Sequence, residues 1–121
     1  MKEYRGPAES NLESAIFNLL LNACQAATCS TQMPEVTVFL TELDEQIYVT
    51  ISDNGPGIPA SVRRTLFDPF VTAGKPNGTG LGLTLARRIA EEHGGNVLLE
   101  ESDREGTEFT LSLTKNRSLG G

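Results

Sequence analysis

The chain has 121 residues, enough for one domain with a modest core, and its 38% apolar and 21% charged residues are typical of a globular protein. A net charge of −6 argues against a general nucleic-acid surface, and no apolar run approaches the roughly 20 residues that a membrane span needs. Cys24 and Cys29 show neither a disulfide nor a metal spacing, so we expect reduced thiols in or near the core of a cytoplasmic protein.

The first predicted element is an amphipathic helix over residues 12–28. Ser10, with Glu13 three residues later, forms a candidate capping box, and apolar residues then recur at steps of three and four. Asn18 and Asn22 stack on one side of this helix. Their neutral amide oxygens suit Mg²⁺, although two polar residues on a solvated helix face would give the same pattern.

Two strands and a turn-rich run follow. Residues 36–53 alternate with period two around a turn at Asp44 and Glu45, which predicts a hairpin. In the next run, DNGPGIP, Asp53 is placed to accept a hydrogen bond from a ligand N–H group. Gly55 and Gly57 would let the backbone approach a flat ring. The alternative is an ordinary Asp-Asn-Gly turn without a ligand.

A short helix is predicted from Pro59, followed by the run LFDPFVT. Phe67 and Phe70 in this run would either anchor one end of a mobile loop or simply fill the core. The arginine pairs at 63–64 and 87–88 are expected on solvated faces, with contact of one member of either pair to a phosphate or a partner left open as the alternative.

The run GKPNGTGLGLTL, residues 74–85, opens a helix predicted over residues 81–93. Backbone amides of alternating glycines at a helix N-terminus form a phosphate site, and Lys75 would add a positive charge. The spacing matches neither a Walker A loop nor a dinucleotide fingerprint, and a flexible loop without ligand is the alternative. Gly94-Gly95 ends the helix, and a hairpin across DREG, residues 103–106, closes the chain.

Four runs in this order, NLLLNA, DNGPGIP, LFDPFVT and GTGLGL, resemble the N, G1, F and G2 boxes of the GHKL ATPase superfamily. The resemblance covers residues from about 10 to 114 and is closest to the ATP-binding catalytic domain of sensor histidine kinases, of nitrogen-regulator-like type. It implies a two-layer α/β sandwich, the Bergerat fold, with a mixed sheet of about five strands on about three helices. It divides the chain into a lead-in with the end of a first strand (1–9), the catalytic domain (10–115) and a loose tail (116–121).

The resemblance also implies ATP and Mg²⁺ as ligands. Asn22 would hold the metal, Asp53 would accept from the adenine amino group, and Thr107 would form the pocket floor. Hydrolytic branches of the superfamily carry a glutamate where Asn18 stands, and an amide cannot act as that general base, so phosphoryl transfer is expected rather than hydrolysis. The catalytic candidates are Asn18, Asn22 and Lys75, and the further nucleotide-binding candidates are Gly55, Gly57, Ile58, Thr72, Gly78, Thr79, Gly80, Leu81, Gly82 and Leu83.

The partners that the resemblance implies are a histidine-containing dimerisation domain and a response regulator, with no nucleic acid and no direct membrane contact by this fragment. We expect a cytoplasmic location, even for a membrane-anchored parent. No phospho-acceptor motif precedes Ser10, and His93 does not resemble one, so the acceptor is expected on a separate domain. Two alternatives stay open: a serine kinase of the anti-sigma-factor type and a non-catalytic nucleotide-sensing module.

Overall fold

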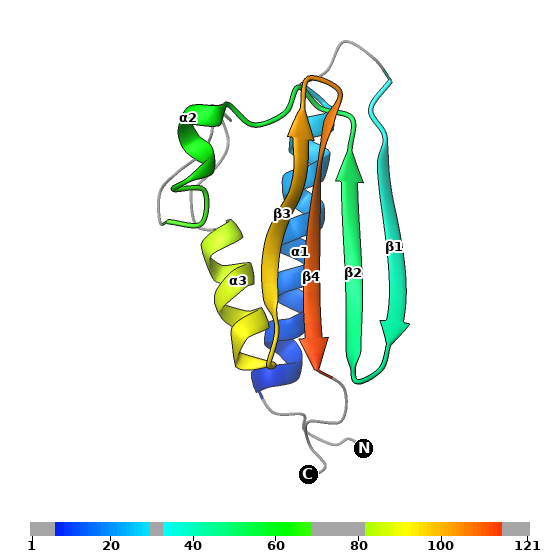
Figure 1. Cartoon of the computed structure of the whole chain (residues 1–121), viewed down its shortest axis with the longest axis vertical. Helices are drawn as coiled ribbons and strands as arrows, with labels where there is room; N and C mark the ends of the chain where they lie inside the picture. Colours follow the sequence, from blue (N-terminus) through cyan, green and yellow to red (C-terminus); the bar gives the residue numbers. More distant parts are fainter. Residues whose placement is uncertain (1–6, 30–32, 69–81, 115–121) are drawn as a thin grey trace.

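The computed structural model describes residues 7–29, 33–68 and 82–114, which form two layers (Figure 1). One layer is a sheet, and α1 and α3 lie together on one of its faces. None of the described helices has the length and apolar character to cross a bilayer. The elements are α1 (Pro7–Ala27), β1 (Val36–Leu43), β2 (Gln46–Asp53), α2 (Ala60–Arg63), α3 (Gly82–Glu92), β3 (Asn96–Asp103) and β4 (Gly106–Thr114).

The sheet has the strand order β1-β2-β4-β3, and each pairing is antiparallel. The sequence predicted a mixed sheet of about five strands, whereas the described residues form four strands without a parallel pair. Both hairpins close through two-residue turns, which can join only antiparallel strands. The first turn places Asp44 at φ 55°, a conformation that Asp tolerates better than most residues. The predicted two-layer sandwich with three helices is confirmed.

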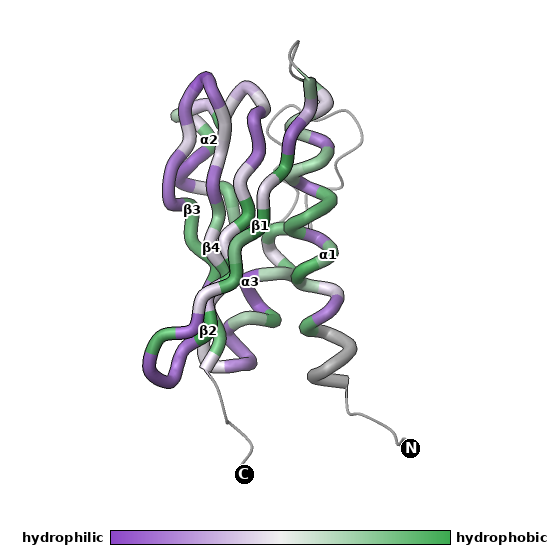
Figure 2. The backbone as a smooth tube through the Cα atoms, turned by 90° about the vertical axis from the view of Figure 1, so that its right-hand side faces the viewer, coloured by the Kyte–Doolittle hydropathy of each residue, from purple (hydrophilic) through white to green (hydrophobic). Residues whose placement is uncertain are grey.

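The hydrophobic core lies between the sheet and the two long helices, where the tube of Figure 2 shows apolar segments of both layers facing each other. Small residues dominate the helix side, so the helix axes can approach the sheet and each other closely. The helices contribute the buried residues Ala15, Leu19, Ala23, Ala86, Ile89 and Ala90, and the sheet contributes Val49, Ile51, Val97, Phe109, Leu111 and Leu113.

Two predictions about α1 are wrong. The helix begins at Pro7, so Ser10 lies inside it and is not its N-cap; proline suits the first helical position because its missing N–H would be unpaired there anyway. Cys24 and Cys29 are free, as expected, but both are exposed rather than near the core. Cys24 follows the buried Ala23 by about 100° around the helix and therefore points away from the sheet.

The end of α3 is formed as predicted. The N–H of Gly95 donates to the carbonyl of Ala90 at 2.9 Å, and Gly94 has a φ of 81°. This is the arrangement in which a left-handed glycine closes a helix. The chain can then turn directly into β3, which places the start of α3 and the end of β3 at the same end of the sheet (Figure 1).

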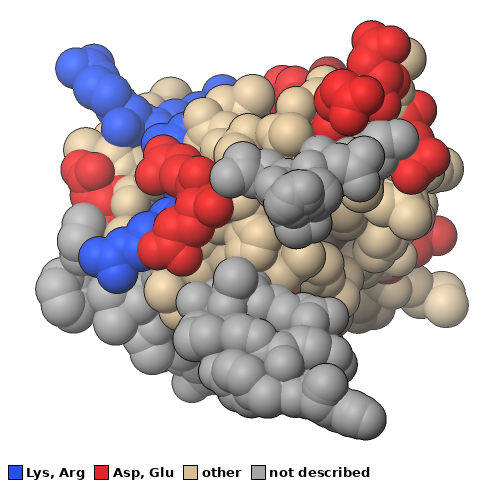
Figure 3. Space-filling view, turned by 90° about the horizontal axis from the view of Figure 1, so that it is seen from below, with Lys and Arg blue, Asp and Glu red and all other residues tan. Residues whose placement is uncertain are grey.

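The charge distribution agrees with the acidic composition. Figure 3 views the molecule from below, and the basic side chains among the described residues, all of them arginines, lie toward one side of this view, beside acidic ones. On this face, the described residues therefore form no broad positive field of the kind that binds a nucleic-acid backbone.

Candidate functional site

Three polar side chains form a row across one end of the sheet. Asp53 of β2 pairs with Thr107 of β4, and Thr107 pairs with Ser102 of β3. The next inward-facing row, Ile51, Phe109 and Leu99, faces the helices as part of the core. Ile51 and Phe109 lie two residues from Asp53 and Thr107, whereas Leu99 lies three residues from Ser102 because the register shifts between them. Because side chains two residues apart share a face, the polar row continues the inner face of the sheet beyond the core. Asp53 is 7% exposed and Thr107 is 5% exposed.

The carboxylate of Asp53 is oriented by the loop that follows it. The N–H of Gly55 donates to Oδ1 of Asp53 at 2.8 Å, which is the local turn expected of an Asp two residues before a glycine. A carboxylate accepts hydrogen bonds and does not donate them when ionised. A ligand that meets Asp53 should therefore present an N–H or O–H group.

The two glycines of this loop allow it to approach other backbone segments. A Cβ atom on Gly55 would lie 2.5 Å from the carbonyl oxygen of Ala26 in α1. A Cβ atom on Gly57, whose φ is 89°, would lie 2.1 Å from the carbonyl oxygen of Asp103. The loop after Asp53 is thus in contact with the end of α1 on one side and with the end of β3 on the other. These contacts fix one wall of the candidate site.

Helix α1 connects this wall to the start of α3. A Cβ atom on Gly82, the first residue of α3, would lie 3.9 Å from the Cβ of Asn18. Asn18, Asn22 and Ala26 are spaced by four residues and so lie along one side of the helix. Asn22, half-buried, therefore lies between the start of α3 and the loop that follows Asp53. The structure thus brings Asn18, Asn22 and Gly82 to the same side of the molecule as that loop.

Ser102 and Arg63 belong to the same wall, and the sequence interpretation missed both. The N–H of Ile58 donates to the Ser102 hydroxyl at 2.8 Å. Arg63 donates from Nε to the carbonyl of Ile58 at 3.0 Å and from Nη2 to the carbonyl of Ser102 at 2.9 Å. Arg63 is exposed, as predicted, but it joins the loop to β3. A spacing of five residues between Ser102 and Thr107 around a hairpin was the available signal.

The segment after α2 is attached to α3. The Thr84 hydroxyl donates to the carbonyl of Phe67 at 2.6 Å, and Phe67 packs edge-on against Phe109. The guanidinium of Arg87 lies 3.9 Å from the centre of the Phe67 ring, and its Nε donates to Asn96. Arg87 is half-buried, so its prediction as a solvated residue is wrong, whereas Arg88 is exposed. Phe67 packs against the core, which is one of its two predicted roles. Its role as the anchor of a mobile loop stays a prediction, because residues 69–81 lie outside the described part of the chain.

The remaining predicted site residues divide into two groups. Leu83 is half-buried and packs against the core, as expected for the start of the helix. The others lie outside the described residues, together with Phe70: Thr72, Lys75, Gly78, Thr79, Gly80 and Leu81.

A hollow of about 190 Å³ lies beside the β3–β4 hairpin. Asp53 and Thr107 border it, and four further acidic residues line it: Glu101, Asp103, Glu105 and Glu108. Within the described part of the chain, no three His, Cys, Asp or Glu side chains are placed to hold a metal ion. These acidic residues would repel a triphosphate, so the phosphates of an anionic ligand are better placed on the α1 side of the polar row than in this hollow.

Comparisons with known proteins agree on one family. Residues 8–117 match the family described as histidine kinase-, DNA gyrase B-, and HSP90-like ATPase. The C4-dicarboxylate transport sensor protein DctB of Rhizobium meliloti (strain 1021) is 41% identical over 104 residues, which are 86% of this chain and 16% of that protein. The signal transduction histidine-protein kinase AtoS of Escherichia coli (strain K12) is 38% identical over 105 residues, 87% of this chain and 17% of that protein.

A solved structure gives the same result. The catalytic domain of the histidine kinase ThkA superimposes with a TM-score of 0.73 at 30% identity, over 88% of this chain and 67% of that one. The chain spans about a sixth of the length of these two curated relatives, one of which is named a sensor protein and the other a histidine-protein kinase.

Proposed function

The chain belongs to the histidine kinase-, DNA gyrase B- and HSP90-like ATPases, and on that premise we propose that it is the ATP-binding catalytic domain of a two-component sensor histidine kinase. It binds ATP with Mg²⁺ and donates the γ-phosphoryl group to a histidine on a separate dimerisation domain. One observation carries the proposal: the buried pair of Asp53 and Thr107 ends the inner face of the sheet next to the helix that bears Asn18 and Asn22.

The polar row has the chemistry that adenine needs. The edge of adenine carries an amino group, which donates, beside a ring nitrogen, which accepts. Asp53 offers an acceptor held in place by Gly55, and Thr107 offers a hydroxyl that can donate. Both side chains are buried, and a buried polar group without a hydrogen-bond partner costs binding free energy. The pair would therefore select a base that presents a donor to Asp53 beside an acceptor for Thr107.

The α1 side of the site suits a magnesium ion bound to phosphate. Mg²⁺ takes oxygen ligands, keeps several waters and needs few protein groups when phosphates supply the rest. The amide oxygen of Asn22 would be such a ligand, and the bound ion would offset negative charge on the phosphates. Asn18, one turn away, cannot remove a proton from water, which favours transfer to a positioned acceptor over hydrolysis. Lys75 at the terminal phosphate stays a prediction.

The partners and the subtype follow from the same proposal. The acceptor is the histidine of a dimerisation domain, and a response regulator takes the phosphoryl group next. The protein works in the cytoplasm, without direct contact of this domain with membrane or nucleic acid. Gln25 departs from those sensor kinases that carry a basic residue at its position, which favours the nitrogen-regulator-like type.

A transfer assay tests the function. The chain is joined to a histidine-bearing dimerisation domain and incubated with ATP labelled at the γ-phosphate and Mg²⁺. We expect label on the dimerisation domain that is lost in acid and retained in alkali, as phosphohistidine requires. Acid-stable label would indicate the serine kinase instead. ATP binding without any label would indicate the nucleotide-sensing module, and absence of ATP binding would refute all three.

A further inference from the structure

Ser102 lies in the wall of the proposed adenine pocket because of a β-bulge. Strands β3 and β4 pair regularly up to Leu99 and Phe109, and the register then shifts between Leu99 and Glu101. Without the shift, Glu101 would stand opposite Thr107. With it, Ser102 takes that place. Bulges commonly re-aim a side chain beside a functional site.

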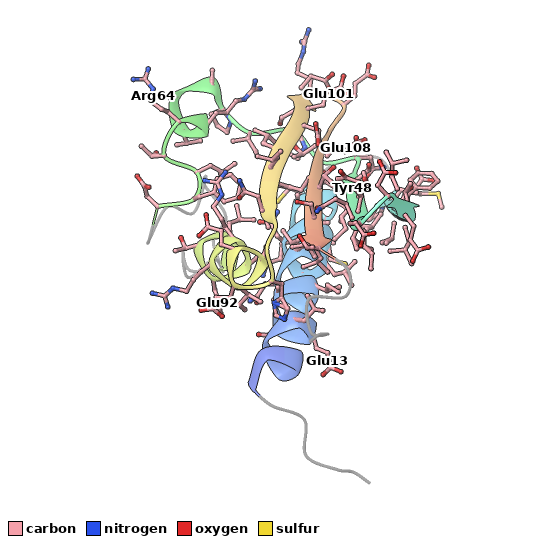
Figure 4. All side chains as sticks on the ribbon, turned by 60° about the horizontal axis from the view of Figure 1, so that its bottom comes forward. Glu13, Tyr48, Arg64, Glu92, Glu101 and Glu108 are labelled. Carbon is pink, nitrogen blue, oxygen red and sulfur yellow. The ribbon has the colours of Figure 1, made fainter. Side chains whose placement is uncertain are left out.

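The shift also decides where a negative charge goes. Glu101 pairs with Glu108, and both labelled side chains lie at the hairpin end of β3 and β4 in Figure 4. The Ser52 hydroxyl of β2 donates a hydrogen bond to the Glu108 carboxylate of β4 at 3.0 Å. Both side chains lie on the face of the sheet that points away from the helices, since Asp53 and Thr107 beside them lie on the inner face. A carboxylate opposite Thr107 would have placed a second negative charge near the buried Asp53 and would have accepted the Thr107 hydrogen. The bulge supplies a neutral hydroxyl there instead.

The hydrogen bonds of Ser102 restrict the direction of its own proton. Its oxygen accepts from the N–H of Ile58 at 2.8 Å and lies 2.8 Å from the Thr107 oxygen. A serine hydroxyl has one hydrogen and two acceptor sites. Among the described residues, the Thr107 oxygen is the acceptor within reach of the Ser102 hydrogen. Either hydroxyl could donate within this pair. With a ligand acceptor in front of Thr107, both hydrogens find an acceptor within the site only if Ser102 donates to Thr107 and Thr107 donates to the ligand.

We propose that Ser102 is a positioning residue that makes the Thr107 hydroxyl a donor toward the ring nitrogen of adenine next to the amino group. The inference rests on the proposed nucleotide-binding function. Once Ser102 donates to Thr107, the hydrogen of Thr107 must point elsewhere, and the pocket then presents an acceptor at Asp53 beside a donor at Thr107. Arg63 supports this arrangement because it holds the carbonyls of both Ile58 and Ser102. Contact with the ring nitrogen is direct or through one water.

The test compares two ligands that differ at one atom. ATP carries the ring nitrogen N1, and 1-deaza-ATP carries a C–H group in its place. Affinities for both are measured by calorimetry on the 121-residue chain with Mg²⁺, as wild type and as Ser102→Ala, Ser102→Thr and Thr107→Val. Ser112→Ala is the matched control, since Ser112 also bonds across the β3–β4 hairpin but at its opposite end.

We expect wild type, Ser102→Thr and Ser112→Ala to prefer ATP over 1-deaza-ATP by the same factor. Thr107→Val should lose this preference, and Ser102→Ala should reduce it by roughly 2- to 10-fold, the range of one hydrogen bond. A purely structural role of Ser102 would weaken both ligands equally and leave the ratio unchanged, which would overturn the inference. If Ser102→Ala does not fold, Ser102→Cys replaces it, because its weak S–H donor should still lower the ratio. Failure of wild type to bind ATP would instead refute the proposed function.

Discussion

Replacing Asp53 by Asn should separate recognition of adenine from folding. In the wild type, the N–H of Gly55 donates to the Asp53 carboxylate at 2.8 Å. The Asn side chain has the same shape and keeps an oxygen that can accept this hydrogen bond. Its second terminal atom becomes an NH₂ donor, which cannot accept from the adenine amino group. The fold should therefore persist while the ligand contact is lost.

The magnitude follows from the burial of Asp53. A hydrogen bond to a charged group contributes about 1.5–3 kcal/mol, and at 7% exposure little solvent is present to replace it. This corresponds to a loss of roughly 10- to 150-fold in ATP affinity. Asp53→Ala should lose as much affinity and also about 1–3 kcal/mol of unfolding free energy, because the N–H of Gly55 is left without its acceptor.

Calorimetric titration with ATP–Mg²⁺ and urea unfolding measure the two quantities. Asp103→Asn is the matched control: Asp103 makes the same kind of turn, accepting from the N–H of Glu105 at 2.8 Å, but is exposed. It should bind ATP like wild type. If Asp53→Asn binds ATP with unchanged affinity, Asp53 does not contact the base and the proposed pocket is wrong.

Three further changes test the walls of the site. Gly57→Ala should cost roughly 2 kcal/mol or more in urea unfolding, because a φ of 89° disfavours a side chain and its Cβ would meet the carbonyl of Asp103; wild-type stability would show that the loop can move away freely. Thr84→Val should cost about 1–3 kcal/mol in the same measurement, since the carbonyl of Phe67 loses its 2.6 Å partner; Thr84→Ser, which keeps the hydroxyl, should restore most of it. Asn22→Ala should make calorimetric ATP affinity nearly independent of added Mg²⁺, and a variant that keeps the wild-type dependence would exclude Asn22 as the metal ligand.

Local pattern was enough to predict most elements and the family. The period-two alternation of residues 36–53 predicted β1, β2 and the turn at Asp44, and Gly94-Gly95 predicted the end of α3. These features depend on neighbours within a few residues, so a single sequence contains them. The start of α1 was missed because Ser10 and Pro7 are both good signals for a helix N-terminus. No local feature of the sequence favours Pro7 over Ser10.

The composition of the polar row, by contrast, depended on contacts between distant segments. Asp53 was recognisable from the sequence because its turn is local, but Ser102 reaches the row only through a bulge, and a shift of one residue would have put Glu101 there. Gly55 is required by the carbonyl of Ala26, and Arg87 is withdrawn from solvent by Phe67, contacts that exist only once the helices have packed on the sheet. Helix and strand formation are properties of short segments, whereas strand register and close backbone contacts are set by packing of the whole chain.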